Sequence, residues 1–175
     1  DAYRGYADLG LRTLRLVRLP GRGSVAHNAA RVVKAIRAEA RRPGVERIVL
    51  VAYSKGVADA MQALALMHAD GGVPRQLQAL ASVAGLVAGS VIVERFGPLY
   101  RTLAPRAAML GCAPADGEEL EGLTREQRAR WLATNPLPRH LRYFSVVAHA
   151  PLEEISPALR PFHDVLSEID QRNDG

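Results

Sequence analysis

The stretch from Arg47 to Ala60 constrains the fold of this chain more than any other segment. Ile48 to Ala52 is a continuous apolar run, which is typical of a parallel strand covered on both faces. A helical period follows at once, with one side of the helix made by Val57, Met61, Leu64 and His68. Ser54 lies between the two patterns. The segment therefore predicts a strand, a sharp turn that holds a serine, and a helix.

The residues two positions from Ser54 on either side are small, Ala52 and Gly56. We expect small neighbours at such a corner, because the backbones of strand and helix nearly touch there. This is the arrangement of the G-x-S-x-G nucleophile elbow, in which the serine hydroxyl projects above the sheet.

Three segments resemble the α/β-hydrolase superfamily, especially its lipase-like and esterase-like serine hydrolases. Ala52-Tyr53-Ser54-Lys55-Gly56 resembles the elbow, with alanine in place of the first glycine. Pro20 to Ser24, with Asn28 in the helix that follows, is similar to the segment before the elbow strand. Arg172 to Gly175 resembles the Asn-Asp-Gly turn that carries the acid. The resemblance covers the chain from about Gly21 to Gly175.

The resemblance implies a serine hydrolase that cleaves a carboxylic ester or related acyl bond in a small-molecule ester or lipid, without a cofactor. Ser54 would be the nucleophile, Asp174 the acid, and the backbone N–H of Lys55 an oxyanion donor. In this superfamily the histidine follows the acid, and a second oxyanion donor precedes the elbow strand. We therefore expect the donor before Asp1 and the histidine beyond Gly175, so that the sequence is the middle of a longer hydrolase.

Each of these residues has a simpler explanation. Ser54 could be a helix N-cap, Asp174 an ordinary turn aspartate, and the side chain of Lys55 merely solvated. His149 follows a predicted strand and is the one stand-in base within the chain, but a structural loop histidine is the preferred explanation of it. Cys112 lies in a Gly-Cys-Ala-Pro loop without a patterned base and is interpreted as a spectator thiol.

The remaining patterns predict an α/β domain over residues 1–175, with a mainly parallel sheet, helices on both sides, and a helical cap at 90–139. A helix is expected over residues 1–10, and a strand with one solvent-exposed face is expected from Leu11 to Leu19. Ser24 is expected to cap a helix over Val25 to Arg42, with Ala29, Val32, Val33 and Ile36 inward. The further elements are strands at 77–83 and 141–148, and helices at 91–103, 124–133 and from Ser156-Pro157 to Asp170.

Charge and composition limit the classes of function that this chain could have. The net charge of +5 comes almost entirely from arginines, since Lys34 and Lys55 are the only lysines. These arginines are spread from Arg4 to Arg172 rather than gathered on one element, so a nucleic-acid partner is not expected. The 48% hydrophobic and 23% charged residues are ordinary for a globular domain.

No apolar run approaches the roughly 18 residues of a membrane span, and no signal segment opens the sequence. These patterns predict a cytoplasmic protein without an integral membrane segment. Asp1 is not an initiator methionine, so the sequence does not decide whether an export signal precedes it. The five histidines and one cysteine lack metal-ligand spacing, and a metal is not expected.

Two further function classes compete with the hydrolase. One is a catalytically inactive, hydrolase-like scaffold that only binds partners. The other is a nucleotide-binding module, because Gly21-Arg22-Gly23-Ser24-Val25-Ala26 loosely matches G-x-G-x-x-G/A. The nucleotide hypothesis requires an acidic residue at the end of the next strand, where Ser54 stands instead, and the sequence has no Walker lysine motif.

Overall fold

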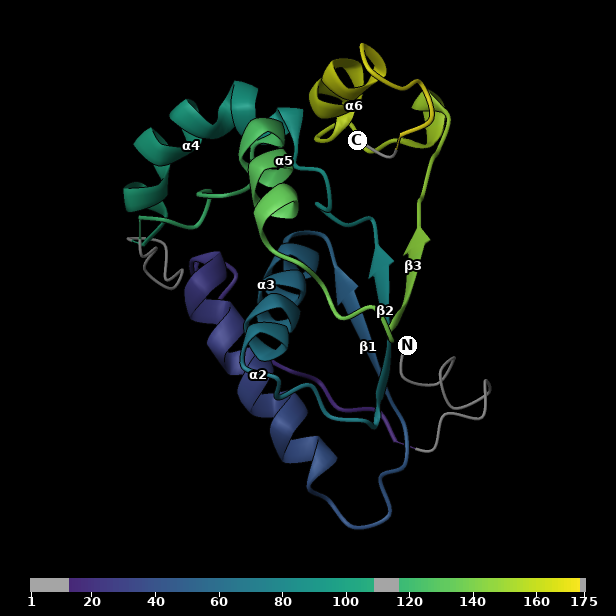
Figure 1. The fold of residues 1–175 in the computed structure, drawn as a ribbon. Coiled ribbons are helices and arrows are strands. Elements are labelled where there is room, and N and C mark those ends of the chain that lie inside the picture. The colour runs from purple at the N-terminus through teal and green to yellow at the C-terminus, as the bar shows by residue number, and fades with distance from the viewer. Residues whose placement is uncertain (1–12, 109–116, 174–175) are drawn as a thin grey trace.

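The computed structural model describes residues 13–108 and 117–173, and a parallel three-stranded sheet lies at its centre (Figure 1). The strands β1 (Ile48–Tyr53), β2 (Leu77–Val83) and β3 (Arg142–Val146) lie side by side in that order. Both neighbouring pairs are parallel, with Tyr53 beside Val83 and Val83 beside Val146. The carboxyl ends of all three strands therefore meet at one edge of the sheet. The α/β fold with a parallel sheet is as predicted.

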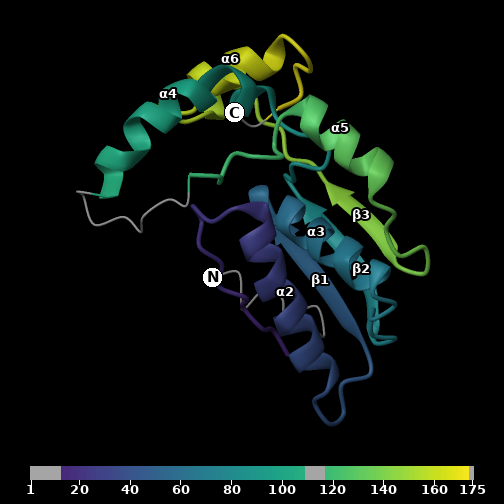
Figure 2. The ribbon, with the colours of Figure 1, turned by 60° about the vertical axis from the view of Figure 1, so that its left-hand side comes forward.

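Two helices, α2 (Val25–Ala40) and α3 (Lys55–Ala69), pack together against one face of the sheet (Figures 1 and 2). The hydroxyl of Ser24 caps α2 by accepting the N–H of His27, as predicted. The apolar side chains of both helices meet those of β1 and β2 in one core, whose buried members include Ala29, Val32, Ile36, Val57, Met61, Leu64, Met67, Leu77 and Leu80. Each fully buried leucine or methionine contributes about 2 kcal/mol through the apolar surface it removes from water.

The opposite face of the sheet is exposed along β1, which corrects the prediction that this strand is covered on both faces. Alternate residues of β1 have exposed side chains, and Tyr53 retains 70% of its accessible surface. In β3 all five residues are exposed. The exposed apolar residues on these two strands include Val49, Val51, Tyr53, Phe144 and Val146. An apolar run in the sequence indicates strand character, but it does not specify which faces receive a covering helix.

Other elements differ from prediction in detail. The strand predicted from Leu11 to Leu19 does not form over its described part, residues 13–19. Alternation alone does not supply a partner, and among the described strands β1 pairs only with β2. His68 is exposed although α3 buries its neighbour Met67. The last helix, α6 (Arg160–Ser167), has Leu159 at its N-cap and not Ser156, and a short 3-10 helix precedes it at Leu152–Glu154. The predicted helix at 1–10, and Cys112, lie outside the described residues.

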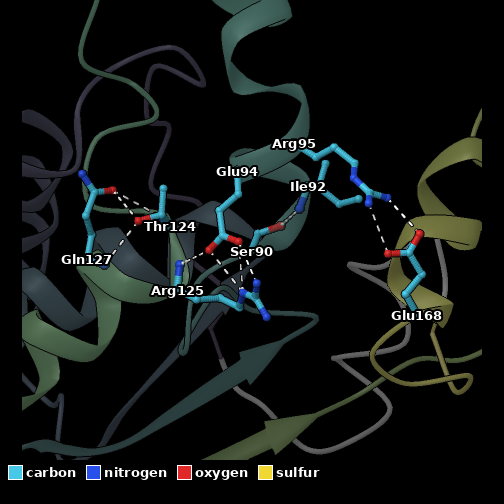
Figure 3. Close-up of polar contacts among 8 residues, drawn as sticks. All are labelled: Ser90, Ile92, Glu94, Arg95, Thr124, Arg125, Gln127 and Glu168. Atoms are coloured by element: carbon cyan, nitrogen blue, oxygen red, sulfur yellow. Dashed lines mark hydrogen bonds and ion pairs between the residues drawn. The ribbon is translucent and has the colours of Figure 1, made fainter.

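The helices α4 (Val91–Ala108), α5 (Arg125–Thr134) and α6 lie beyond the carboxyl ends of the strands (Figure 1). Charged side chains join them. The guanidinium of Arg125 binds both carboxylate oxygens of Glu94, and that of Arg95 binds both oxygens of Glu168 (Figure 3). The predicted capping box at Thr124 and Gln127 is also present. The assignment of residues 90–139 as a cap within a single domain stays a prediction.

No helix among the described residues is long and apolar enough to cross a membrane.

Candidate functional site

Ser54 occupies the corner between the last residue of β1 and the first residue of α3. Its backbone has φ 51° and ψ −127°, a conformation that residues with a Cβ rarely adopt. Its half-buried side chain makes no capping hydrogen bond to α3. The simpler explanation of Ser54 as a helix N-cap therefore has no support in this geometry, because capping requires the hydroxyl to accept a first-turn N–H.

Backbone hydrogen bonds hold this strained corner in place. The N–H of Ser54 donates to the carbonyl of Val83 at 3.0 Å, and the carbonyl of Ser54 accepts from Val57 at 3.1 Å and from Leu86 at 3.3 Å. Ala84, directly after β2, also has a positive φ of 43° and donates to the carbonyl of Val146 at 2.9 Å. Ser54 and Ala84 are the two non-glycine residues with positive φ in the described part of the chain. Strained backbone of this kind concentrates at functional sites.

The small residues around the corner have different roles from those expected. A Cβ on Gly56 would have no described atom within 4 Å. The expectation that a close approach of strand and helix requires a small residue at position 56 is therefore not supported. Gly85 is the tightly packed position, since a Cβ there would lie 2.2 Å from Ser82 Oγ and 2.4 Å from Val57 Cγ2. The glycine that lets strand and helix approach each other thus follows β2, one strand away from the elbow.

The side chain of Lys55 is not simply solvated, which corrects the simpler explanation of this residue. Its Nζ lies 2.9 Å from Oδ1 of Asp59, one turn further along α3, and the side chain is 19% exposed. The amide Nδ2 of Asn28, on α2, donates to Oδ2 of Asp59 at 2.9 Å and to the carbonyl of Pro20 at 3.1 Å. Asp59 and Asn28 are both buried. We call Lys55, Asp59 and Asn28 the polar triplet.

Burial raises the pKa of the Asp59 carboxyl above its ordinary value. The Lys55 ammonium, through a hydrogen bond and its charge, and the Asn28 amide act in the opposite direction with smaller effects. Asp59 was not predicted as a site residue from the sequence. The Lys-x-x-x-Asp spacing, which places both side chains on one helix face, was the available signal.

Asp174 lies outside the described residues, but its neighbour Asn173 is placed. The carbonyl of Asn173 accepts the N–H of Ala150, just after β3, at 3.1 Å. Its buried side-chain amide donates to Ser167 Oγ at 3.0 Å and to the carbonyl of Asp170 at 2.9 Å. The chain therefore returns at Asn173 to the loop that follows β3, on the same edge of the sheet as Ser54.

The described residues do not assemble a complete triad. His149 is exposed, and no described hydrogen bond links Ser54 Oγ to a histidine. The electrostatic effect of His149 acts on Asp170, whose pKa it helps to lower after the larger effects of the backbone N–H and side chain of Arg172. Groups of three or more His, Cys, Asp or Glu residues that could hold a metal are absent from the described part of the chain.

In the glycine-containing turn before α2, other groups of the protein already use the hydrogen-bond donors and the space that a phosphate would need. Gly23 donates to the carbonyl of Pro20, and a Cβ on Gly23 would lie 2.8 Å from Asn28 Oδ1. The Ser24 hydroxyl accepts a first-turn N–H of α2, the kind of group that a bound phosphate would use. No observation here favours the nucleotide-binding hypothesis.

Solved structures with the same architecture include two enzymes. The metagenomic carboxyl esterase MGS0156 is 37% identical, with a TM-score of 0.77 over 90% of this chain. The lipase BlEst2 of Bacillus licheniformis, in its mature form, is 20% identical with a TM-score of 0.56 over 86% of this chain, and its propeptide form gives 19% and 0.57. The chain has an α/β-hydrolase-like fold of the esterase and lipase kind.

This hydrolase-like chain spans 46% of the carboxyl esterase, and 58% of the mature lipase. No protein-family model matches the sequence, and the curated proteins give no match either. At about 20% identity, the likeness to BlEst2 concerns the fold alone.

Proposed function

We propose that this chain carries the nucleophile of a serine hydrolase that cleaves a carboxylic ester or related acyl bond. The observation that carries the proposal is the corner at Ser54, at the carboxyl edge of the sheet, where φ is positive and the hydroxyl makes no capping bond to α3 within the described part of the chain. The likeness to a carboxyl esterase at 37% identity supports the choice of an ester as substrate.

In the proposed reaction Ser54 Oγ attacks the carbonyl carbon of the substrate and gives its proton to a histidine. The tetrahedral intermediate collapses, the C–O bond of the ester breaks, and the alcohol leaves with the proton held by the histidine. Water then attacks the acyl-serine with the same histidine as base, which releases the acid and restores Ser54.

Lys55 would stabilise the oxyanion of that intermediate through its backbone N–H. As the first residue of α3, Lys55 belongs to the turn whose N–H groups have no partner within the helix. The positive end of the α3 dipole adds to the favourable field at this point. One such donor contributes roughly 3 to 4 kcal/mol to the stability of the transition state.

Asp174 is the proposed acid that orients the histidine. The placement of Asn173 beside the loop after β3 supports this role, because it brings the chain to the correct edge one residue before Asp174. We propose that the histidine lies outside residues 1–175, because in the superfamily that the sequence resembles the histidine follows the acid. His149 is the base to test if no other histidine serves.

A fluorophosphonate probe tests the proposal, because it reacts with an activated serine and stays attached. We expect the full-length protein to be labelled on the peptide that contains Ser54, and labelling to vanish in the Ser54→Ala variant. Ser145→Ala, an exposed serine on β3, is the matched control and should label normally. Labelling at another residue, or ester hydrolysis that persists in Ser54→Ala, would refute the proposal.

A further inference from the structure

The polar triplet lies one helical turn from the proposed nucleophile. Lys55 directly follows Ser54, and its Nζ binds Asp59 at 2.9 Å. Asp59 binds Asn28 at 2.9 Å through its other carboxylate oxygen, and Asn28 binds the carbonyl of Pro20 at 3.1 Å. A continuous set of contacts therefore connects the start of α3 with α2 and with the turn that precedes α2.

The stability of the fold does not explain a carboxylate at position 59. The Asp59 side chain is 3% exposed, and burial of a carboxylate is costly even when it is paired. The raised pKa of Asp59 indicates that the loss of hydration outweighs the attraction of its two partners. Apolar side chains of similar volume would fill the space between α2 and α3 without this cost.

The position of the ammonium points to the same conclusion. A cation in the first turn of a helix is opposed by the positive end of the helix dipole. Lys55 stands at the first position of α3, and Asp59 lies four residues later on the same helix face. The carboxylate of Asp59 thus holds the Lys55 side chain along α3.

We propose that Asp59 is a positioning residue: by binding Lys55 and Asn28 at the same time, it fixes the backbone N–H of Lys55 where the oxyanion of the reaction forms. This inference rests on the proposed function, because it assigns Asp59 a role at the Ser54 site. Asp59 does not touch the substrate. It acts through the first turn of α3, whose orientation against α2 depends on these contacts.

The test compares Asp59→Asn and Lys55→Met in the full-length protein, with an activated ester as substrate. Asp59→Asn keeps the volume of the side chain and removes its charge, and Lys55→Met removes the ammonium but keeps the backbone N–H. We expect kcat to fall about tenfold to a hundredfold in each variant while KM changes less than about threefold, since misplacement of a catalytic group by a fraction of an ångström acts on the chemical step. The double variant should resemble the single variants, because the contacts act as one unit.

Asp70→Asn is the matched control, an aspartate at the other end of α3 that is mostly exposed and pairs with Arg37. Its kcat and KM should equal those of the wild type. Thermal unfolding of every variant separates positioning from loss of structure, and Lys55→Met keeps the test decisive if Asp59→Asn does not fold. Unchanged kcat, or a rise in KM alone, would overturn the inference while Ser54 still reacts with the fluorophosphonate probe. A wild type without labelling at Ser54 would instead refute the proposed function.

Discussion

Ser24 and Ser54 both stand directly before a helix, the first before α2 and the second before α3. Ser24 has an extended backbone, φ −60° and ψ 158°, and its hydroxyl accepts the N–H of His27. Ser54 has φ 51° and makes no capping bond. The same residue at the same kind of position thus caps a helix in one case and makes no capping bond in the other. Backbone conformation, rather than residue type, makes the difference.

The largest effect expected from this comparison concerns catalysis. Ser54→Ala should lower kcat/KM for ester hydrolysis by at least about a thousandfold, since the nucleophile is removed. Ser24→Ala should stay within about twofold of the wild type, because its hydroxyl is occupied at the N-terminus of α2. Steady-state kinetics of both variants check this prediction, and equal losses in the two would break the comparison.

The second effect is on stability and is expected at Ser24. Ser24→Ala should lower the free energy of unfolding by about 1 kcal/mol, the usual contribution of an N-cap serine. Ser54→Ala removes no capping bond and should change it less. Urea unfolding followed by circular dichroism measures both values, with Ser145→Ala as a control for the loss of an exposed hydroxyl. A larger destabilisation by Ser54→Ala would mean that Ser54 caps α3 in solution.

Glycine substitutions should give opposite signs at the two corners. Glycine adopts positive φ without the penalty of a Cβ, so Ser54→Gly should raise the free energy of unfolding by roughly 0.5 to 1 kcal/mol. Ser24→Gly should lower the free energy of unfolding by roughly a few tenths of a kcal/mol, because Ser24 has an ordinary extended conformation and the variant loses only the capping hydrogen bond. The same unfolding experiment measures both. Two changes of equal sign would contradict the assigned strain.

The smallest effect is a dependence of stability on pH that arises beside Ser54. The pKa of Asp59 is raised by burial, so the folded protein holds a proton that the unfolded chain releases at about pH 4. The stability that Asp59 contributes is therefore fully present below that pH and is lost as the pH rises through its folded pKa. Unfolding free energies of the wild type, measured relative to Asp59→Asn, should fall across this range and then level off. A difference that grows with pH would show a lowered pKa.

Local signals in the sequence predicted much of this fold. The cap at Ser24, the capping box at Thr124 and the bounds of β2 depend on residues a few positions apart, and all three were confirmed. The corner at Ser54 belongs to the same class, because a strand, a serine and a helix follow one another directly. The assignment of Ser54 as nucleophile stays a prediction.

Features that depend on distant parts of the chain were predicted less well. The sequence of β1 does not determine whether a helix covers Val51 and Tyr53, and their exposure was not predicted. The strand expected from Leu11 to Leu19 does not form over the described residues 13–19, because alternation alone does not supply a partner strand. The contact between Asn28 and Asp59 joins residues 31 positions apart, so no local pattern indicated it. The Lys55–Asp59 contact is different, because its Lys-x-x-x-Asp spacing is local and could have corrected the interpretation of Lys55 as solvated.

Direct observation of the acyl-enzyme tests the proposal that the hydroxyl of Ser54 attacks an ester. The full-length protein would be mixed with an activated ester, quenched in acid within the first turnovers, and mapped by mass spectrometry. The account predicts an acyl group on Ser54 and none on Ser24. An acyl group on another residue, or an active protein with Ser54 unmodified at every time point, would contradict it.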